Sequence, residues 1–331
     1  MVDARGVRLL LNEHSAGYNT PQTAKRFNLE DFYSNFKCVV TEENKEEYRL
    51  EFDLIRLDPS IANAIRRILI GEFPSVAIEK VFMYNNTSVL QDEVLAHRMG
   101  LLPIRLDGRL LDFKKPDDNV NSTNTLEFEL KVVCSKNRRA GEDETDPNVK
   151  YVNSNVLSSQ LKWLPMPDQV ETFGTVEAAF PDILIAKLRP GHEIDIKCHA
   201  VKGIGRDHAK FSPVATAFYR MLPDIKLLKS FKGEEATQLQ KCFSEGVIGI
   251  KKKKSGEREA FVAKARNDQC AMEVYRHENL KNHVQLSKIR DHILFTVESV
   301  GVVPPDELVR GALTILENTC SELIDYIDAQ F

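Results

Sequence analysis

The glycine pair in the segment VKGIGRDHAK is the one place where this sequence approaches a phosphate-binding motif. Gly203 and Gly205 have the spacing that opens a dinucleotide-binding loop, in which backbone amides hold a pyrophosphate. The segment lacks the third glycine of that motif and also the Gly-Lys-Ser/Thr ending of a P-loop. We therefore interpret Gly203-Ile204-Gly205 as a tight turn. An enzyme of small-molecule type that uses this loop up to His208 is the weaker alternative.

Possible metal ligands gather in the same region, at His192, Cys198, His199 and His208. Neighbouring residues on a strand point to opposite faces, so Cys198 and His199 are not expected to bind the same metal ion. The spacing is not that of a zinc knuckle, and the six cysteines include no C-x-x-C pair. No paired carboxylates and no nucleophile with an adjacent base stand out. We predict no catalytic residue, no metal and no cofactor.

Charge and composition restrict the partners without naming them. The chain carries 45 basic and 49 acidic residues, a net charge of -4, which excludes binding nucleic acid by bulk electrostatics. No apolar stretch approaches the roughly 18 residues of a membrane span, and the N-terminus lacks a signal-peptide pattern. The scattered cysteines favour a reducing compartment. The Lys251–Lys254 run fits either a nuclear import signal or a solvated hairpin tip.

Residues 58–75 have the clearest helix signals in the chain. Asp58 is a capping residue, and Pro59 stands at the first helical position, where its missing N–H is not needed. The apolar residues recur with helical spacing and predict one apolar face; they are Ile61, Ile65, Ile68 and Leu69. Arg66 and Arg67 flank that face and are suited to bidentate pairing with carboxylates of a partner.

The C-terminal segment 304–330 predicts a second, longer helix that begins at two prolines and two acidic residues. Its apolar residues follow heptad-type spacing; they are Val309, Leu313, Leu316, Cys320, Leu323 and Ile327. A helix with so broad an apolar stripe requires a partner on more than one flank. Core packing within the chain and binding of a second chain both remain open as explanations of the two stripes.

The other elements are shorter. Alternating apolar residues predict a half-buried strand within 36–57, a strand at 76–84 and a short helix at 91–99. Further strands are expected at 125–133, 183–189 and 292–301, with a hairpin over 246–265 that turns at Ser255-Gly256. Residues 1–35 show little periodicity and are interpreted as an extended or partly ordered arm.

Four ordered blocks resemble the α-like subunits of cellular RNA polymerases. DPSIANAIRRILIGEFPSVAIEKVFMYNNTS resembles the signature helix of that family, with its N-A-x-R-R-I-L core. QDEVLAHRMGLLPI is similar to the next family segment, and KGIGRDHAKFSPVATAFYRMLPDI to a block shared by eukaryotic and archaeal members. VESVG and the long C-terminal helix are similar to the closing element of the family. The blocks span most of residues 36–331.

The resemblance implies an α+β fold with a dimerisation domain in two pieces, 36–80 and 225–331, an inserted α+β domain at 81–224 and an N-terminal arm at 1–35. Family members pair with a smaller α-like subunit through the two helices. The implied interface residues are Ile61, Ile65, Ile68, Leu69, Leu313, Leu316 and Leu323. The second arginine of the family motif faces the second-largest subunit. This makes Arg67, with Arg66 beside it, the expected large-subunit contact.

The resemblance further implies a non-catalytic assembly subunit of a nuclear, including nucleolar, RNA polymerase. It would pair with the smaller α-like subunit, nucleate docking of the second-largest and largest subunits, and meet DNA only through the complex. Polymerase II members typically carry a zinc-binding cysteine cluster where residues 105–119 read RLDGRLLDFKKPDDN here. The missing cluster favours the branch shared by polymerases I and III. A polymerase II subunit and a free-standing homodimeric module are the alternatives.

Overall fold

A computed structural model describes residues 8–18, 28–141, 144–252 and 257–330, which form two compact units of mixed helices and strands. Both units combine helices with sheets, so the predicted α+β class is confirmed. Unit 1 contains the described residues of 1–43, 51–63 and 218–296. Unit 2 contains those of 44–50, 64–217 and 297–331. No described helix is both long enough and apolar enough to cross a membrane.

The compact units divide the chain at other positions than the predicted domains. The boundary between them runs through the helix that follows Asp58, whereas the predicted insert begins at residue 81. The two units are defined by contacts within this chain, whereas a dimerisation domain is defined by contacts with another subunit. The predicted two-piece dimerisation domain therefore stays a prediction.

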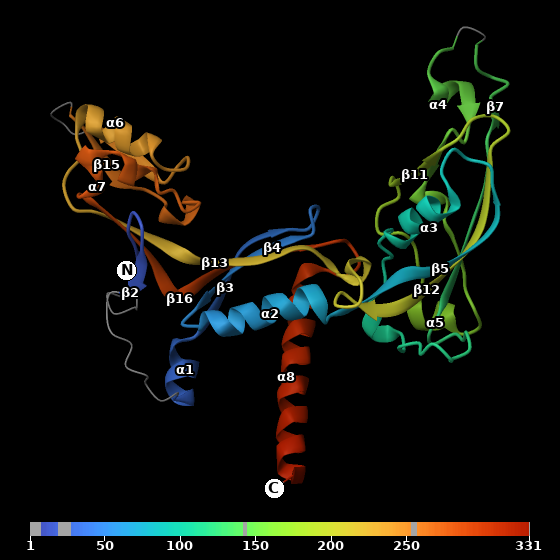
Figure 1. The fold of residues 1–331 in the computed structure, drawn as a ribbon, viewed down its shortest axis with the longest axis horizontal. Helices are drawn as coiled ribbons and strands as arrows, with labels where there is room; N and C mark the ends of the chain where they lie inside the picture. Colours follow the sequence, from blue (N-terminus) through green and yellow to red (C-terminus); the bar gives the residue numbers. More distant parts are fainter. Residues whose placement is uncertain (1–7, 19–27, 142–143, 253–256, 331) are drawn as a thin grey trace. The chain divides into compact units, whose positions relative to one another are not determined.

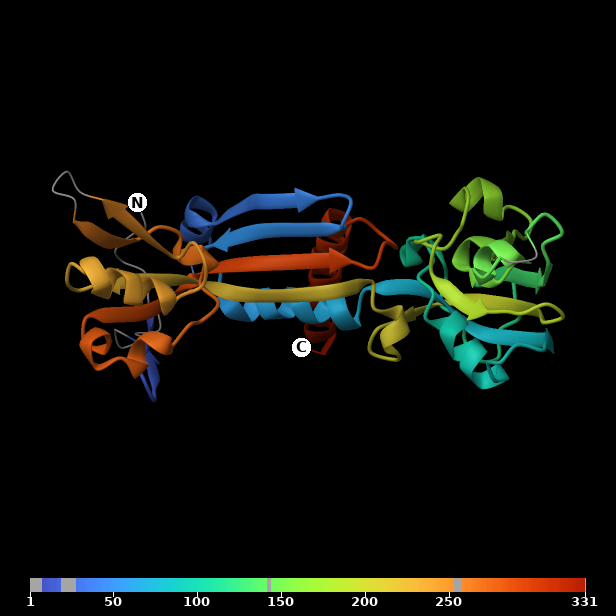
Figure 2. The same cartoon turned by 90° about the horizontal axis from the view of Figure 1, so that it is seen from above.

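A six-stranded sheet lies mostly in unit 1 (Figure 2). Its strands run in the order β2-β1-β16-β4-β3, and β13 pairs with β16. They are β1 Arg8–Leu11, β2 Ala16–Tyr18, β3 Lys37–Asn44, β4 Arg49–Ile55, β13 Val214–Leu227 and β16 Val284–Ser299. Phe52 of β4 stacks on Phe295 of β16, with ring centroids 5.2 Å apart. The alternation that predicted a strand within 36–57 thus belongs to β4, whose Leu50, Phe52 and Leu54 are buried.

The described part of the N-terminal arm is ordered and partly built into this sheet. Strand β1 pairs antiparallel with β16, where Arg8 lies opposite Ile289. The Arg8 Nε atom lies 2.5 Å from Asp224 Oδ2 on β13. Helix α1, Leu29–Asn35, begins at Asn28, whose side chain accepts the N–H of Glu30. Strands β1 and β2 have four and three residues and α1 has seven, and elements this short leave little periodicity, which explains why the sequence did not predict them.

Unit 1 also holds a small layer of helices and a hairpin around a second core. The elements are α6 Gly233–Lys241, α7 Glu278–Lys281, β14 Ile248–Lys252 and β15 Arg258–Val262. Phe231, Leu239, Val247 and Leu280 are fully buried among them. The predicted hairpin is confirmed as β14 and β15. Its predicted Ser255-Gly256 turn, like the last two lysines of the Lys251–Lys254 run, lies outside the described residues.

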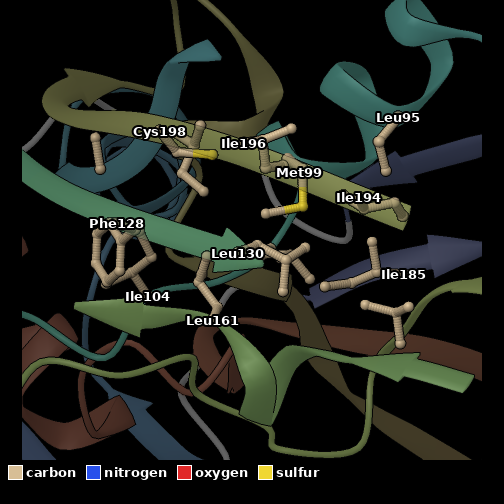
Figure 3. Packing of buried hydrophobic residues seen from close by; sticks show 14 of the residues in the cluster. Leu95, Met99, Ile104, Phe128, Leu130, Leu161, Ile185, Ile194, Ile196 and Cys198 are labelled. Atoms are coloured by element: carbon tan, nitrogen blue, oxygen red, sulfur yellow. The ribbon is translucent and has the colours of Figure 1, made fainter. Parts of the chain in front are cut away.

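Unit 2 is built on a four-stranded sheet in the order β10-β6-β12-β5. Its strands are β5 Pro74–Asn86, β6 Leu126–Val133, β10 Lys162–Leu164 and β12 Glu193–Ile204. Shorter elements surround it: α3 Asp92–Gly100, β7 Ser135–Lys136, α4 Pro147–Lys150, β8 Tyr151–Val152, β9 Asn155–Leu157, α5 Gln169–Phe173 and β11 Leu184–Lys187. Residues of β12 alternate, and Ile194, Ile196 and Cys198 point into the core that Figure 3 shows.

Two long helices complete the fold, and both were predicted. Helix α2 spans Pro59–Gly71, and helix α8 spans Pro305–Gln330 as one continuous element (Figure 1). Asp58 caps α2: its Oδ1 atom accepts the N–H of Ser60 at 2.9 Å, and Arg290 Nη2 lies 3.1 Å from its Oδ2. The buried residues of α8 are near its start and include Leu308, Gly311 and Ala312.

The Asp58 cap is expected to stabilise the chain in a pH-dependent way. The pKa of Asp58 is lowered from 3.8, first by the Ser60 N–H and also by Arg290, although burial opposes the shift. A lowered pKa in the folded state means that this stability is present above the unfolded pKa and is lost as the pH falls through the folded one. Asp58→Ala should lower the free energy of unfolding by about 0.5–2 kcal/mol at pH 7. In urea unfolding this difference should shrink below about pH 4, and a difference that is independent of pH would contradict the charged cap.

Gly311 is expected to be required for the packing of α8. A Cβ atom at this position would lie 2.4 Å from Cε2 of Phe73, whose ring is fully buried. Gly311→Ala should therefore lower the free energy of unfolding by about 1–3 kcal/mol, despite the better helix propensity of Ala. Gly71→Ala is the matched control in α2, because a Cβ there meets nothing within 4 Å. Urea unfolding that leaves Gly311→Ala as stable as the parent chain would contradict this packing.

Candidate subunit interface

The C-terminal half of α8 is exposed on all sides. Every residue from Glu317 to Gln330 is exposed, because only the first turns of the helix pack against the rest of the chain. Large apolar side chains of α8 are exposed from Leu313 onward: Leu313 46%, Leu323 58%, Ile324 57%, Tyr326 65% and Ile327 52% exposed. Single exposed apolar residues are ordinary, but a contiguous apolar stripe on a projecting helix is typical of an interaction surface.

The predicted interface residues separate into an exposed and a buried group. Leu313 and Leu323 lie on the exposed stripe of α8, and Leu316 is half-buried beside it. Ile61, near the start of α2, is 40% exposed. The other three residues of α2 are buried within the chain itself; they are Ile65 at 4%, Ile68 at 6% and Leu69 at 0% exposed. Ile61 and the exposed stripe of α8 are therefore available to another chain. The other three apolar residues of the α2 face belong to the core of this chain.

The predicted arginine pair lies beside a third arginine that the sequence did not single out. Arg66 is half-buried and Arg67 is exposed on α2. The turn after β12 meets the C-terminal end of this helix, because the N–H of Arg206 donates to the carbonyl of Gly71 at 2.9 Å. Together they form an open recess of about 280 Å³ in unit 2. Its lining residues are Arg66, Arg67, Ile70, Gly71, Glu72, Gly205 and Arg206.

Gly205 makes this approach possible. A Cβ atom at Gly205 would lie 2.1 Å from the carbonyl oxygen of Ile70, so only glycine fits there. Strand β12 ends at Ile204 and a turn follows over 205–207. The predicted turn at Gly203-Ile204-Gly205 is therefore displaced: Gly203 and Ile204 are the last residues of β12, and only Gly205 lies in the turn. A backbone held this close to the helix presents the next side chain, that of Arg206, to the recess.

The possible metal ligands do not converge. Cys198 is fully buried, and burial raises the pKa of its thiol to about 12. His199 lies on the opposite face, where Nε2 is 3.3 Å from Glu127 Oε1 and the ring meets Phe82 edge-on. Desolvation lowers the pKa of His199, and Glu127 opposes that shift. Within the described ranges, no group of three or more His, Cys, Asp or Glu residues is placed to hold a metal ion.

Comparison with known proteins places the chain in a family. A family model described as the RNA polymerase Rpb3/Rpb11 dimerisation domain matches residues 51–320. The chain belongs to this family of RNA polymerase subunits. The match includes α2 and most of α8, up to residue 320.

Individual relatives are similar over nearly the whole chain. The subunit RPAC1 of DNA-directed RNA polymerases I and III from Mus musculus is 48% identical over 317 residues, which are 95% of this chain and 89% of the relative. The RPAC1 subunit from Saccharomyces cerevisiae is 46% identical over 90% of this chain and 89% of its own length. Subunit 3 of DNA-directed RNA polymerases II, IV and V from Arabidopsis thaliana is 30% identical over 86% of this chain and 89% of its own length.

Proposed function

We propose that this chain is the non-catalytic α-like assembly subunit of nuclear DNA-directed RNA polymerases I and III. One observation carries the proposal: a chain 46–48% identical to such subunits leaves the apolar stripe of α8 uncovered. A helix of this kind is stable in water once a partner covers its stripe. The chain acts in the nucleus, including the nucleolus.

The partner for the α8 stripe is the smaller α-like subunit. Leu313, Leu316 and Leu323 of α8, with Ile61 of α2, form the heterodimer surface, and the exposed Ile324 and Ile327 extend it. The helix offers about 39 Å of length at 1.5 Å per residue, which suits helix-to-helix packing with another chain. The dimerisation domain comprises 36–80 and 225–331, and the insert comprises 81–224. Ile65, Ile68 and Leu69 support this surface from the core.

The arginines of α2 bind the large subunits. Arg66 and Arg67 contact the second-largest subunit once the heterodimer has formed, and the largest subunit docks afterwards. Polymerisation and its magnesium belong to those subunits, and this chain meets DNA only through them. Its net charge of -4 suits a scaffold whose main contacts are with protein.

Two other assignments are weaker. A polymerase II subunit is disfavoured because the identity to the polymerase II, IV and V relative is 30%, and because residues 103–119 contain no cysteine for a zinc cluster. A free-standing homodimeric module would use the same α8 stripe, and it is separated from the proposal by the composition of the native complex.

Affinity purification of the tagged chain from its own cells tests the proposal. Mass spectrometry should identify one smaller α-like subunit together with large subunits of both polymerase I and polymerase III. Recovery with polymerase II subunits alone, or with no polymerase subunit, would overturn it. The purified chain alone should not polymerise nucleotides on a template.

A further inference from the structure

We infer that Arg206 joins Arg66 and Arg67 in a three-arginine recess that receives a carboxylate-bearing segment of the large-subunit partner. The inference rests on the proposed function and gives that contact a specific site, a further residue and a ligand chemistry. Two segments far apart in the sequence, the end of α2 and the turn after β12, meet at this recess.

The backbone fixes Arg206 relative to α2. Its N–H donates to the carbonyl of Gly71, and Gly205 lies against the Ile70 carbonyl so closely that no side chain fits between them. The side chain is also directed, since Arg206 Nη2 donates to Glu72 Oε1 at 3.1 Å. This ion pair is solvent-exposed, with the Arg206 side chain 69% and the Glu72 side chain 37% exposed. It orients the guanidinium and leaves most of its surface open to a ligand.

The recess has an excess of positive charge and of hydrogen-bond donors. Three arginines and one acidic residue, Glu72, line it. Each guanidinium has five N–H donors in a planar fork, which matches the two oxygens of a carboxylate. Within the part of the chain that the structure describes, Arg67 makes no hydrogen bond or ion pair. Within the recess, the single negative charge of Glu72 does not balance the positive charges of the three arginines.

The size and surroundings of the recess favour an acidic side chain over a nucleic-acid backbone. A volume of about 280 Å³ accommodates one or two side chains, and Ile70 and Gly71 supply apolar walls. A polyanion requires an extended positive surface, whereas this chain has a net charge of -4. Aspartate or glutamate residues of a protein segment fit both the charge and the dimensions. Such charge-assisted pairs are strongest where the partner displaces water.

Arg206→Lys provides a direct chemical test in the assembled heterodimer. A carbodiimide couples lysine amines to carboxylates, but it does not couple arginine. The heterodimer carrying Arg206→Lys, mixed with the second-largest subunit and then treated, should therefore yield a crosslink from position 206 to an aspartate or glutamate of that subunit. Peptide mapping that finds position 206 joined only to Glu72 of the same chain would overturn the inference.

Arg206→Glu measures the contribution of the site to recruitment. Retention of the second-largest subunit on the heterodimer should fall by roughly tenfold or more at low salt, while heterodimer mass and melting temperature stay as in the parent. Arg138→Glu is the matched control, since Arg138 is exposed in unit 2 and does not line the recess. Equal retention by both variants would overturn the inference and leave the proposed function standing. Failure of the parent heterodimer to retain the subunit would instead contradict the proposed function.

Discussion

Leu323→Asp is expected to abolish pairing with the smaller α-like subunit while the chain itself stays folded. Leu323 is 58% exposed, so in the free chain the new charge remains in water. In the proposed heterodimer the same charge would be buried without a partner, which costs several kcal/mol. Co-expression with a tagged smaller subunit, followed by pull-down, measures the pairing. The circular dichroism and thermal unfolding of the variant should match those of the parent chain.

Asn318→Asp is the matched control for this effect. Asn318 is exposed on the same half of α8, but helical geometry places it across the helix from the apolar stripe. The substitution Asn318→Asp adds the same charge as Leu323→Asp and should leave pairing with the smaller subunit intact. If Leu323→Asp were recovered with the smaller subunit as fully as Asn318→Asp, the α8 stripe would not be the heterodimer surface.

Ile65→Asp is expected to unfold the chain, with or without a partner. Ile65 is only 4% exposed, so an aspartate there is buried inside the chain itself. The penalty of several kcal/mol is a large fraction of the 5–15 kcal/mol that stabilises a typical domain. Thermal unfolding followed by circular dichroism should show no cooperative transition at the temperature where the parent melts.

Ile61→Asp separates this effect from a loss of binding. Ile61 stands one turn earlier on α2 and is 40% exposed, so its replacement should leave the fold intact and weaken pairing instead. A folded Ile65→Asp chain that loses only its partner would place Ile65 in the heterodimer surface. The two variants thus divide α2 between core and interface.

Helices and strands with local start signals or a regular apolar spacing could be predicted from the sequence. Asp58 and Pro59 marked the start of α2, and heptad spacing traced α8 to within a few residues of its end. Both signals are local, since capping and helical periodicity depend on residues within a few turns. The alternation around Phe52 was equally local, and it corresponds to β4.

The division of an apolar face between core and interface could not be predicted in the same way. Ile61 and Ile65 lie on one helical stripe and have the same side chain, yet one is exposed and the other buried. Periodicity identifies the stripe, but the rest of the fold determines how much of it is covered. The exposed Ile324 and Tyr326 carried the same ambiguity, because both simply extend an apolar helix.

Contacts between segments far apart in the chain could not be predicted from the sequence either. Arg206 reaches the end of α2 only because β12 and its turn bring it there, and no local pattern near Arg67 indicates this. The two glycines before Arg206 predicted a turn, of which only Gly205 is part, and they did not indicate what that turn would approach. Strand β1 was missed for the same reason, since its partner β16 lies at the other end of the chain.

The mass of the complex formed with the smaller α-like subunit tests the central claim most directly. The two chains, co-expressed and purified together, should give by native mass spectrometry a single species containing one copy of each. A homodimer of this chain that excludes the smaller subunit would contradict the account.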